Sequence, residues 1–367
     1  MKSGVYLHVP FCIDKCNYCD FFSVHWDERL KDSYLRALAL EVELRAKSCS
    51  GLVFDTLFFG GGTPSLFSPA DLEFVFEILQ NHLSLELIEV TVECNPGTVS
   101  EEFFKALSGL GVTRISFGVQ SFDDQLLKFL GRSHSSLEAV KSLEAARKSG
   151  FDNIGVDLIY AIPGQTSVQW EQSIYQSLSL GVEHISIYEL TVEDDTPLKR
   201  TLNAGKIRLP NESLVEQMYF TAVDLLDKSG LFKYEISNFA RHKKQCLHNM
   251  NYWAHGEYLG LGPSAHSFLD GHRFHNTASL RQYVETLLCG KDPCTGIEEI
   301  SCETADFERV MLALRTSEGV ELSSLTPGMK VQAASLIREG LLKRKAGNLC
   351  LTSRGIMLSN EVFLRFM

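Results

Sequence analysis

The first two hundred residues alternate short apolar runs with stretches of helical periodicity. The runs are rich in Val, Ile, Phe and Tyr, which suit a buried, pleated strand. We predict six strands, at Val5–Val9, Val53–Phe59, Glu89–Cys94, Arg114–Gly118, Asn153–Ile159 and His184–Glu189. Between the first two runs, apolar side chains recur every four residues from Leu30 to Val42. Ser68 and Pro69 are an N-cap residue and a first helical residue, and they predict the start of the next helix.

This alternation predicts an α/β fold with a parallel sheet, because parallel strands need crossover connections and helices supply them. Six strands are too few to close the eight-stranded barrel of this class. An incomplete (β/α)6 barrel and a doubly wound sheet both satisfy the pattern. The strands and their helices occupy residues 1–205, which we predict to form one domain.

The pattern changes after residue 205. A helical stretch over Asn211–Ser229 and a segment rich in His, Asn, Tyr and Gly predict an α+β elaboration over residues 206–300. Residues 301–367 predict two helices followed by two strands, the order of a winged-helix-like domain, at Asp306–Thr316, Lys330–Glu339, Gly340–Arg344 and Asn348–Thr352. This last unit has nine basic and seven acidic residues, a net of +2. Nucleic-acid recognition requires a strongly basic face, so we expect no nucleic-acid partner.

The overall charge and the apolar content narrow the class of protein further. The formal net charge of −11 argues against binding of the whole chain to DNA or to anionic lipid. No apolar run reaches the roughly 18 residues of a transmembrane helix, and the first twelve residues are too polar for a secretory signal. We therefore expect a cytoplasmic protein. In that compartment its ten cysteines are expected to serve as metal ligands, reactive thiols or buried residues rather than as disulfides.

Three cysteines lie close together on a loop that follows the first predicted strand. Cys12, Cys16 and Cys19 can converge on one centre from such a loop, and ligand sites of α/β folds form at strand ends. Zinc would take a fourth ligand such as His8. An iron–sulfur cluster held by only three thiolates would keep one iron open for another ligand. The residues themselves leave both metals open.

The C-x3-C-x2-C spacing, with Tyr18 just before the last cysteine, resembles the radical S-adenosylmethionine superfamily. The resemblance implies a [4Fe–4S] cluster held by Cys12, Cys16 and Cys19. It also implies that the open iron chelates the methionine end of S-adenosylmethionine, whose sulfonium is cleaved by an electron from the cluster to give a 5′-deoxyadenosyl radical. The fold expected from it is the incomplete (β/α)6 parallel barrel.

Further polar and glycine residues follow the ends of successive predicted strands. Gly60-Gly61-Gly62-Thr63-Pro64 follows the second strand, and its glycines would let the backbone approach a ligand closely. Polar side chains at the next strand ends could supply the donors and acceptors that a zwitterion, a ribose and an adenine need. The resemblance implies that S-adenosylmethionine is bound by Tyr6, Tyr18, Gly61, Gly62, Thr63, Glu93, Gln120, Arg132 and Asp157.

Longer segments resemble the oxygen-independent coproporphyrinogen III oxidase group over nearly the whole chain. These segments are Tyr6–Cys12, Gly60–Pro64, Gly118–Phe122, Asp157–Pro163 and Leu259–Ala265. True oxidases of this group have a fourth cysteine two residues after the third, where this chain has Phe21. They also have a longer N-terminal extension, whereas this chain begins eleven residues before Cys12. Both differences resemble the heme chaperone family within the group.

The distribution of histidines agrees with a heme-related function. Six of the eleven histidines lie between His242 and His275. Among them, the segment His248–Trp253 resembles the H-N-x-x-Y-W motif of the chaperone family. Imidazole is an axial ligand of heme iron, and aromatic rings pack on porphyrin faces. The candidate heme residues are His248, Asn249, Tyr252 and Trp253, with Cys246 as a second candidate ligand.

We therefore predict a heme chaperone that carries a [4Fe–4S] cluster and S-adenosylmethionine and passes heme, as cargo, to acceptor hemoproteins such as membrane respiratory enzymes. We also expect a homodimer that works in the cytoplasm, with peripheral association at the inner face of the membrane. The alternative enzyme is a coproporphyrinogen III oxidase, which would convert two propionates to vinyl groups. A zinc-stabilised structural protein is a third hypothesis.

Overall fold

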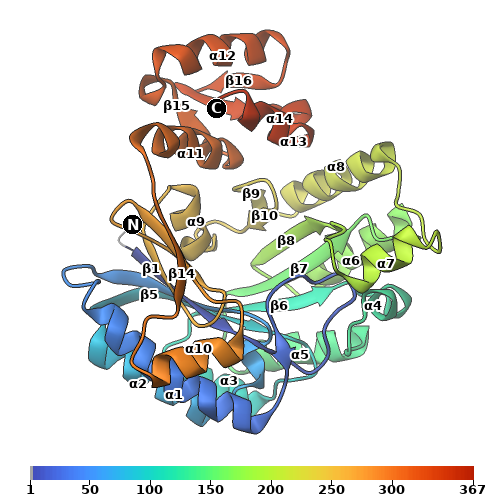
Figure 1. Ribbon diagram of the computed structural model, residues 1–367. Coiled ribbons are helices and arrows are strands. Elements are labelled where there is room, and N and C mark those ends of the chain that lie inside the picture. Colours follow the sequence, from blue (N-terminus) through green and yellow to red (C-terminus); the bar gives the residue numbers. More distant parts are fainter. Residues whose placement is uncertain (1–2) are drawn as a thin grey trace.

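A computed structural model describes residues 3–367 of the chain (Figure 1). In this part of the chain, one twelve-stranded sheet has the order β14-β13-β12-β11-β1-β4-β5-β6-β7-β8-β10-β9. Its central strands are β1 (Ser3–Val9), β4 (Phe54–Gly61), β5 (Leu85–Cys94), β6 (Arg114–Gln120), β7 (Ile154–Tyr160) and β8 (His184–Glu189). These six strands are parallel to one another, and each overlaps one of the six predicted strands.

Helices connect the parallel strands. They are α1 (Glu28–Ala46), α2 (Pro69–His82), α3 (Glu101–Gly109), α4 (Asp124–Leu130), α5 (Ser136–Lys148) and α6 (Ser167–Ser179). A short helix, η1 (Pro64–Leu66), precedes α2. Helices α1, α2, α3, α5 and α10 lie together below the sheet in Figure 1. Ser68 and Pro69 start α2 as predicted, with a reciprocal capping box between Ser68 and Asp71.

The sheet is open: β1 pairs with β4 and β11, and β8 pairs with β7 and β10. The prediction of an α/β fold with an incomplete parallel barrel is therefore confirmed. Side chains alternate between the two sides of each strand. On β1, the fully buried Val5, Leu7 and Val9 belong to the hydrophobic core. The residues between them, Tyr6 and His8, line cavities on the other side.

Both edges of the parallel sheet are extended by strands from residues 206–300, where the sequence predicts an α+β elaboration without the positions of its strands. The added strands are β9 (Phe232–Lys233), β10 (Asn238–Ala240), β11 (Tyr258–Leu261), β12 (His266–Leu269), β13 (His272–Asn276) and β14 (Cys294–Glu299). Strand β11 is parallel to β1, whereas the β11–β12, β12–β13 and β13–β14 pairs are antiparallel. Helix α7 (Pro197–Asn203) precedes this region, whose own helices are α8 (Glu212–Lys228), α9 (Leu247–Trp253) and α10 (Leu280–Leu288).

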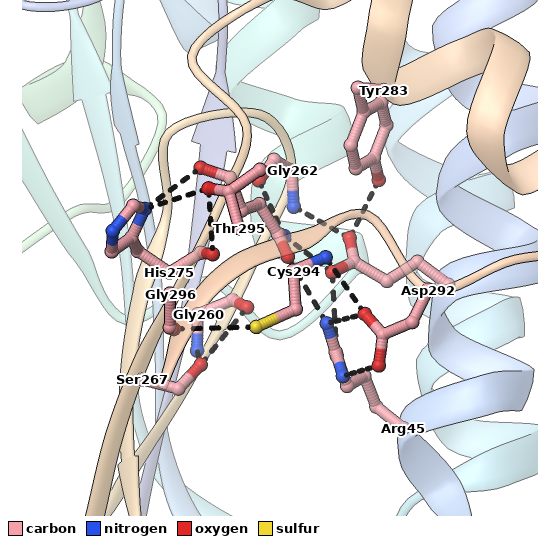
Figure 2. A network of polar contacts seen from close by, with 12 residues as sticks. Arg45, Gly260, Gly262, Ser267, His275, Tyr283, Asp292, Cys294, Thr295 and Gly296 are labelled. Atoms are coloured by element: carbon pink, nitrogen blue, oxygen red, sulfur yellow. Dashed lines mark hydrogen bonds and ion pairs between the residues drawn. The ribbon is translucent and has the colours of Figure 1, made fainter. Parts of the chain in front are cut away.

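A polar network attaches the strand extension to the first helix (Figure 2). The Arg45 guanidinium of α1 makes an ion pair with Asp292 at 2.7 Å, just before β14. Buried Glu41, one turn earlier on α1, accepts hydrogen bonds from the Tyr283 hydroxyl (2.6 Å), the Gly262 amide (2.8 Å) and the Asn276 amide nitrogen (2.5 Å). These contacts join α1, α10 and the strands after β11 into one unit.

The C-terminal elements form a separate hydrophobic cluster, seen as the red region at one end of the molecule in Figure 1. They are α11 (Cys302–Arg315), β15 (Val320–Glu321), η2 (Leu322–Ser324), α12 (Pro327–Arg338), β16 (Leu342–Lys345), β17 (Asn348–Leu351), α13 (Ser353–Met357) and α14 (Ser359–Leu364). The three strands form a small antiparallel sheet in the order β15-β17-β16. This is the winged-helix-like arrangement that the pattern predicts. The boundaries at 205 and 300 stay predictions.

Candidate functional site

The three cysteines lie on a loop that is held at both ends. Cys12 ends β2 (Phe11–Cys12), which pairs with β3 (Val24–His25). The amide of Val24 donates to the Pro10 carbonyl (2.7 Å), and the amide of Trp26 donates to the Cys12 carbonyl (2.8 Å). Cys16 and Cys19 belong to the intervening loop, and all three thiols are free and partly buried. They line one cavity of about 590 Å³, which we call the cysteine cavity.

The cysteine cavity gathers most of the residues that the resemblance assigns to S-adenosylmethionine. They are Tyr18, Gly61, Gly62, Thr63, Glu93, Gln120, Arg132 and Asp157. Strands β4 to β7 place most of them there, because parallel strands bring their carboxyl ends to one edge of the sheet. Tyr18 comes from the cysteine loop, and Arg132 from the segment after α4. Tyr6 lies outside this set. It lines two neighbouring cavities instead, and its hydroxyl hydrogen-bonds to the His8 ring at 3.1 Å.

A chain of hydrogen bonds connects two of the cysteines through the cavity wall. The Thr63 hydroxyl lies 3.7 Å from the Cys12 sulfur and accepts a hydrogen bond from Asn95 (2.9 Å). Arg132 donates to Asn95 (2.7 Å) and to the Cys16 sulfur (3.4 Å). A third hydrogen bond, from Arg132 to the Gly118 carbonyl (2.6 Å), fixes the guanidinium against β6. The side chains of Thr63 and Arg132 therefore supply hydrogen-bond donors to the Cys12 and Cys16 sulfurs.

The carboxylates of the cavity lie in an environment that disfavours their charged forms. Burial, and then the nearby charge of Asp157, raise the pKa of Glu93 to about 8, so this carboxyl is mostly protonated at neutral pH. Burial also raises the pKa of Asp157, although hydrogen bonding from Ser186 and the charge of buried Arg114 oppose the shift. Burial raises the pKa of the Cys19 thiol to about 11. A cation in this cavity would stabilise all three ionised forms.

Close backbone contacts and a positive φ require glycine at Gly61 and Gly62, at the end of β4. A side chain at Gly62 would place its Cβ 2.5 Å from the Phe11 carbonyl oxygen, and the Gly62 amide donates to the Val9 carbonyl (2.7 Å). Gly61 has a φ of +103°, which favours glycine. This packing holds the Gly-Gly-Thr-Pro segment against the cysteine loop, and it places Thr63 beside Cys12.

The residues of the cysteine cavity fit an iron–sulfur cluster with a polar cofactor better than a bare metal ion. Within residues 3–367, no three His, Cys, Asp or Glu side chains are grouped closely enough to hold a bare metal ion. The cysteine cavity nevertheless brings three thiols together with two buried polar atoms that lack partners in the described structure, the Gln120 side-chain oxygen and the Arg132 Nε. Gln120 also has a φ of +67°, a strained backbone for this residue type. Sulfur ligands beside unpartnered polar groups fit a cluster together with a polar cofactor.

The candidate heme residues divide between two further cavities. One is the inner cavity of about 200 Å³, lined by buried polar residues such as Glu93, Arg114 and Asp157 and also by His248, Asn249 and Tyr252. The other we call the aromatic cavity, of about 750 Å³, lined by Tyr252 and Trp253 and by Phe21, Phe22, Tyr258 and Phe268.

His248 is fully occupied by contacts inside the protein. Its side chain is 1% exposed, and its two ring nitrogens hydrogen-bond to the Thr56 hydroxyl (2.9 Å) and the Tyr252 hydroxyl (2.8 Å). Burial lowers the pKa of His248 to about 3, so the ring is neutral. In this arrangement the imidazole presents no nitrogen to a ligand. Cys246 is likewise buried, with its thiol 3.5 Å from Glu89.

Several cavity residues were not identified from the sequence. Asn95, Gly118 and Tyr188 line the cysteine cavity, and Arg114 lies behind it in the inner cavity. Asn95 and Tyr188 lie at or just beyond the ends of β5 and β8, so extending the strand-end argument by one or two residues would have found them. Arg114 begins β6 and points inward among acidic groups, which its sequence neighbours do not indicate.

Comparisons with known proteins agree with this geometry. The chain matches the Radical SAM superfamily over residues 6–174 and the HemN C-terminal domain over residues 300–358. It is 35% identical to the heme chaperone HemW of Bacillus subtilis (strain 168), covering 100% of this chain and 99% of the relative. It is also 35% identical to the heme chaperone HemW of Lactococcus lactis subsp. lactis (strain IL1403), covering 100% and 97%.

A solved structure shares the whole fold. Coproporphyrinogen III oxidase (HemN) from Escherichia coli aligns with a TM-score of 0.87, covering 100% of this chain and 90% of that chain at 21% sequence identity. At this identity the likeness shows the fold alone. The matches to both HemW proteins extend over nearly the full length of each protein. The chain therefore belongs to the radical SAM superfamily and, within it, to the family of the HemW heme chaperones.

Proposed function

We propose that this protein binds heme and passes it to acceptor hemoproteins, and that it carries a [4Fe–4S] cluster and S-adenosylmethionine. One observation carries the proposal: the chain is 35% identical over its whole length to proteins named heme chaperones. The position of Phe21 also supports the proposal, because the related oxidases have a fourth cysteine at this position. Its ring is 64% exposed and lines both the cysteine cavity and the aromatic cavity.

In this proposal Cys12, Cys16 and Cys19 hold the cluster. Arg132 and Thr63 would donate hydrogen bonds to the cluster sulfur ligands and so favour their thiolate forms. The remaining cavity groups would hold S-adenosylmethionine beside the open iron, namely Tyr18, Gly61, Gly62, Glu93, Gln120 and Asp157, with Tyr6 at the neighbouring wall. When bound, the cluster supplies an electron that can cleave the cofactor; in a carrier this chemistry would serve assembly or transfer.

The heme would lie against the H-N-x-x-Y-W segment, where Tyr252 and Trp253 offer their rings to the aromatic cavity. We further propose that the protein works as a homodimer in the cytoplasm, at the inner face of the membrane, where it would deliver heme to membrane respiratory enzymes. Within residues 3–367, no helix is long and apolar enough to cross a membrane. We propose that attachment at the membrane is peripheral.

Two measurements on anaerobically reconstituted protein test this function against the oxidase alternative. In the first, heme-loaded protein is mixed with an apo-hemoprotein, and the absorbance of the acceptor reports transfer; we expect transfer faster than from serum albumin as a passive heme donor. In the second, the protein is incubated with coproporphyrinogen III, S-adenosylmethionine and a reductant. We expect no protoporphyrinogen beyond a single turnover. Repeated turnover, or transfer no faster than the passive control, would overturn the proposal.

A further inference from the structure

The aromatic cavity has the volume and the lining that a large aromatic ligand requires. Its volume of about 750 Å³ lies within the usual range for small-molecule sites, and more of its lining is aromatic than charged. Tyr258 and Phe268 come from the paired strands β11 and β12, whereas Met311 and Leu312 come from α11. The cavity thus lies where the strand extension meets the C-terminal helix.

Three histidines line this cavity, and two of them are already engaged. The two ring nitrogens of His8 bond to the Phe22 carbonyl (2.8 Å) and the Tyr6 hydroxyl (3.1 Å). His255 bonds through Nε2 to Glu308 at 3.0 Å, which ties α9 to α11. His266 is exposed and has no hydrogen-bond partner for either ring nitrogen among the described residues. The His255 side chain is only 9% exposed, so His266 has the most accessible of the three imidazoles.

The backbone around His266 is held in place by the segment Leu259–Ala265, one of the five that resemble the oxidase group. A Cβ at Gly260 would lie 2.0 Å from the His266 carbonyl oxygen, so the β11–β12 hairpin closes this tightly only with glycine there. The Gly260 amide also donates to the Ser267 hydroxyl (2.9 Å). Ser264, which lines the cavity just before His266, has a φ of +63°. Such strained backbone is concentrated at ligand sites.

Phe21 offers an apolar ring to the cavity, and its exposure is not explained by packing inside the protein. It is 64% exposed on the cysteine loop and lines the aromatic cavity together with Asp20 and Phe22. Aromatic rings pack on porphyrin faces, and imidazole is a standard axial ligand of heme iron. His248 offers no such nitrogen, because both of its ring nitrogens are hydrogen-bonded inside the protein.

We propose that heme binds in the aromatic cavity, with a ring nitrogen of His266 as its iron ligand and the Phe21 ring packed on the porphyrin. This inference rests on the proposed function and deepens it, since it assigns the heme site. It keeps Tyr252 and Trp253 of the H-N-x-x-Y-W segment as walls of the site. It gives His248 a structural role in place of ligation.

The test is a titration of the full-length reconstituted protein with ferric heme, followed by absorbance and by resonance Raman spectroscopy. The variants are His266→Ala, His248→Ala, Phe21→Ala and, as a matched control, His272→Ala, whose exposed ring lies on the next strand outside the cavity. Circular dichroism confirms that each variant is folded. We expect wild type and His272→Ala to share one saturable Soret band with an iron–imidazole signature. His266→Ala should lose that signature and regain it when free imidazole is added.

Phe21→Ala should keep the iron–imidazole signature while the dissociation constant for heme rises roughly tenfold, the loss expected for one well-packed ring. Saturable heme binding by wild type with an unchanged signature in His266→Ala would overturn the site and leave the proposed function standing. Loss of the signature in a folded His248→Ala variant, with His266→Ala unaffected, would place the ligand at His248 instead. Failure of wild type to saturate would overturn the proposed function itself.

Discussion

At the scale of single residues, Arg132 connects more of the site than any other side chain. It hydrogen-bonds to a cysteine sulfur, to Asn95 and to the carbonyl of Gly118, and Asn95 continues the chain to Thr63 beside Cys12. Hydrogen bonds to a charged donor are shorter and stronger than neutral ones. The loops after β2, β4 and β5 are therefore positioned together rather than independently.

Replacement of Cys16 tests the ligand assignment. Cys16→Ser should abolish formation of the cluster, because two thiolates and a hydroxyl hold it poorly, and the iron and sulfide content after anaerobic reconstitution measures this. The control is Cys289→Ser, an exposed thiol at the end of α10. Full iron content in Cys16→Ser would show that this thiol is not a ligand. Zinc in place of iron in wild type would favour the structural-metal hypothesis.

The buried ring of His248 predicts part of the acid sensitivity of the fold. Its folded pKa of about 3 lies below the ordinary value of 6.5, so below pH 6.5 the unfolded chain binds a proton that the folded state excludes. The free energy of unfolding should therefore fall with decreasing pH between 6.5 and 3, by about 1.4 kcal/mol per pH unit from this group.

Urea denaturation at a series of pH values measures this contribution. The His248→Gln variant, which keeps a hydrogen-bonding side chain, should have a flatter dependence than wild type below pH 6.5. His272→Gln, a change at an exposed site, should follow the wild-type curve. An identical slope in wild type and His248→Gln would show that this ring is protonated in the folded state as easily as in the unfolded chain.

At the scale of elements, the six parallel strands could be predicted and the flanking strands could not. The six predicted strands between Val5 and Glu189 belong to a parallel sheet that helices cover. Such strands are recognised in a sequence as continuous runs of apolar residues. Strands such as β9 and β13 are two and five residues long, and neither contains a continuous apolar run. Their position depends on pairing with distant partners, such as β11 with β1, which no local pattern encodes.

The network of Figure 2 predicts how tightly the strand extension is attached. The Tyr283 hydroxyl donates to Glu41, and both side chains are fully buried. Tyr283→Phe leaves a buried acceptor with one donor fewer and should lower the free energy of unfolding by about 1–3 kcal/mol. Chemical denaturation checks this, with the exposed Tyr175→Phe of α6 as control. Equal stability of the two variants would mean that the Tyr283–Glu41 hydrogen bond contributes nothing net.

At the scale of the whole molecule, the structure places two large cavities side by side, with Asp20 and Phe21 lining both. The sequence predicts the cysteine cavity well, because ligand groups at strand ends converge in any parallel sheet. It predicts the aromatic cavity poorly. Residues such as Phe21, His266 and Leu312 are far apart in the chain. They line one cavity only because β11 pairs with β1, β12 pairs with β11, and α11 lies beside them.

The proposed function depends most on heme binding itself, and one measurement tests heme binding directly. Anaerobically reconstituted wild-type protein is titrated with heme and followed by absorbance, with the chain concentration determined independently. We expect a defined Soret band that saturates at one heme per chain. Featureless uptake that rises without saturation would contradict the heme-chaperone function and would make the oxidase the leading hypothesis.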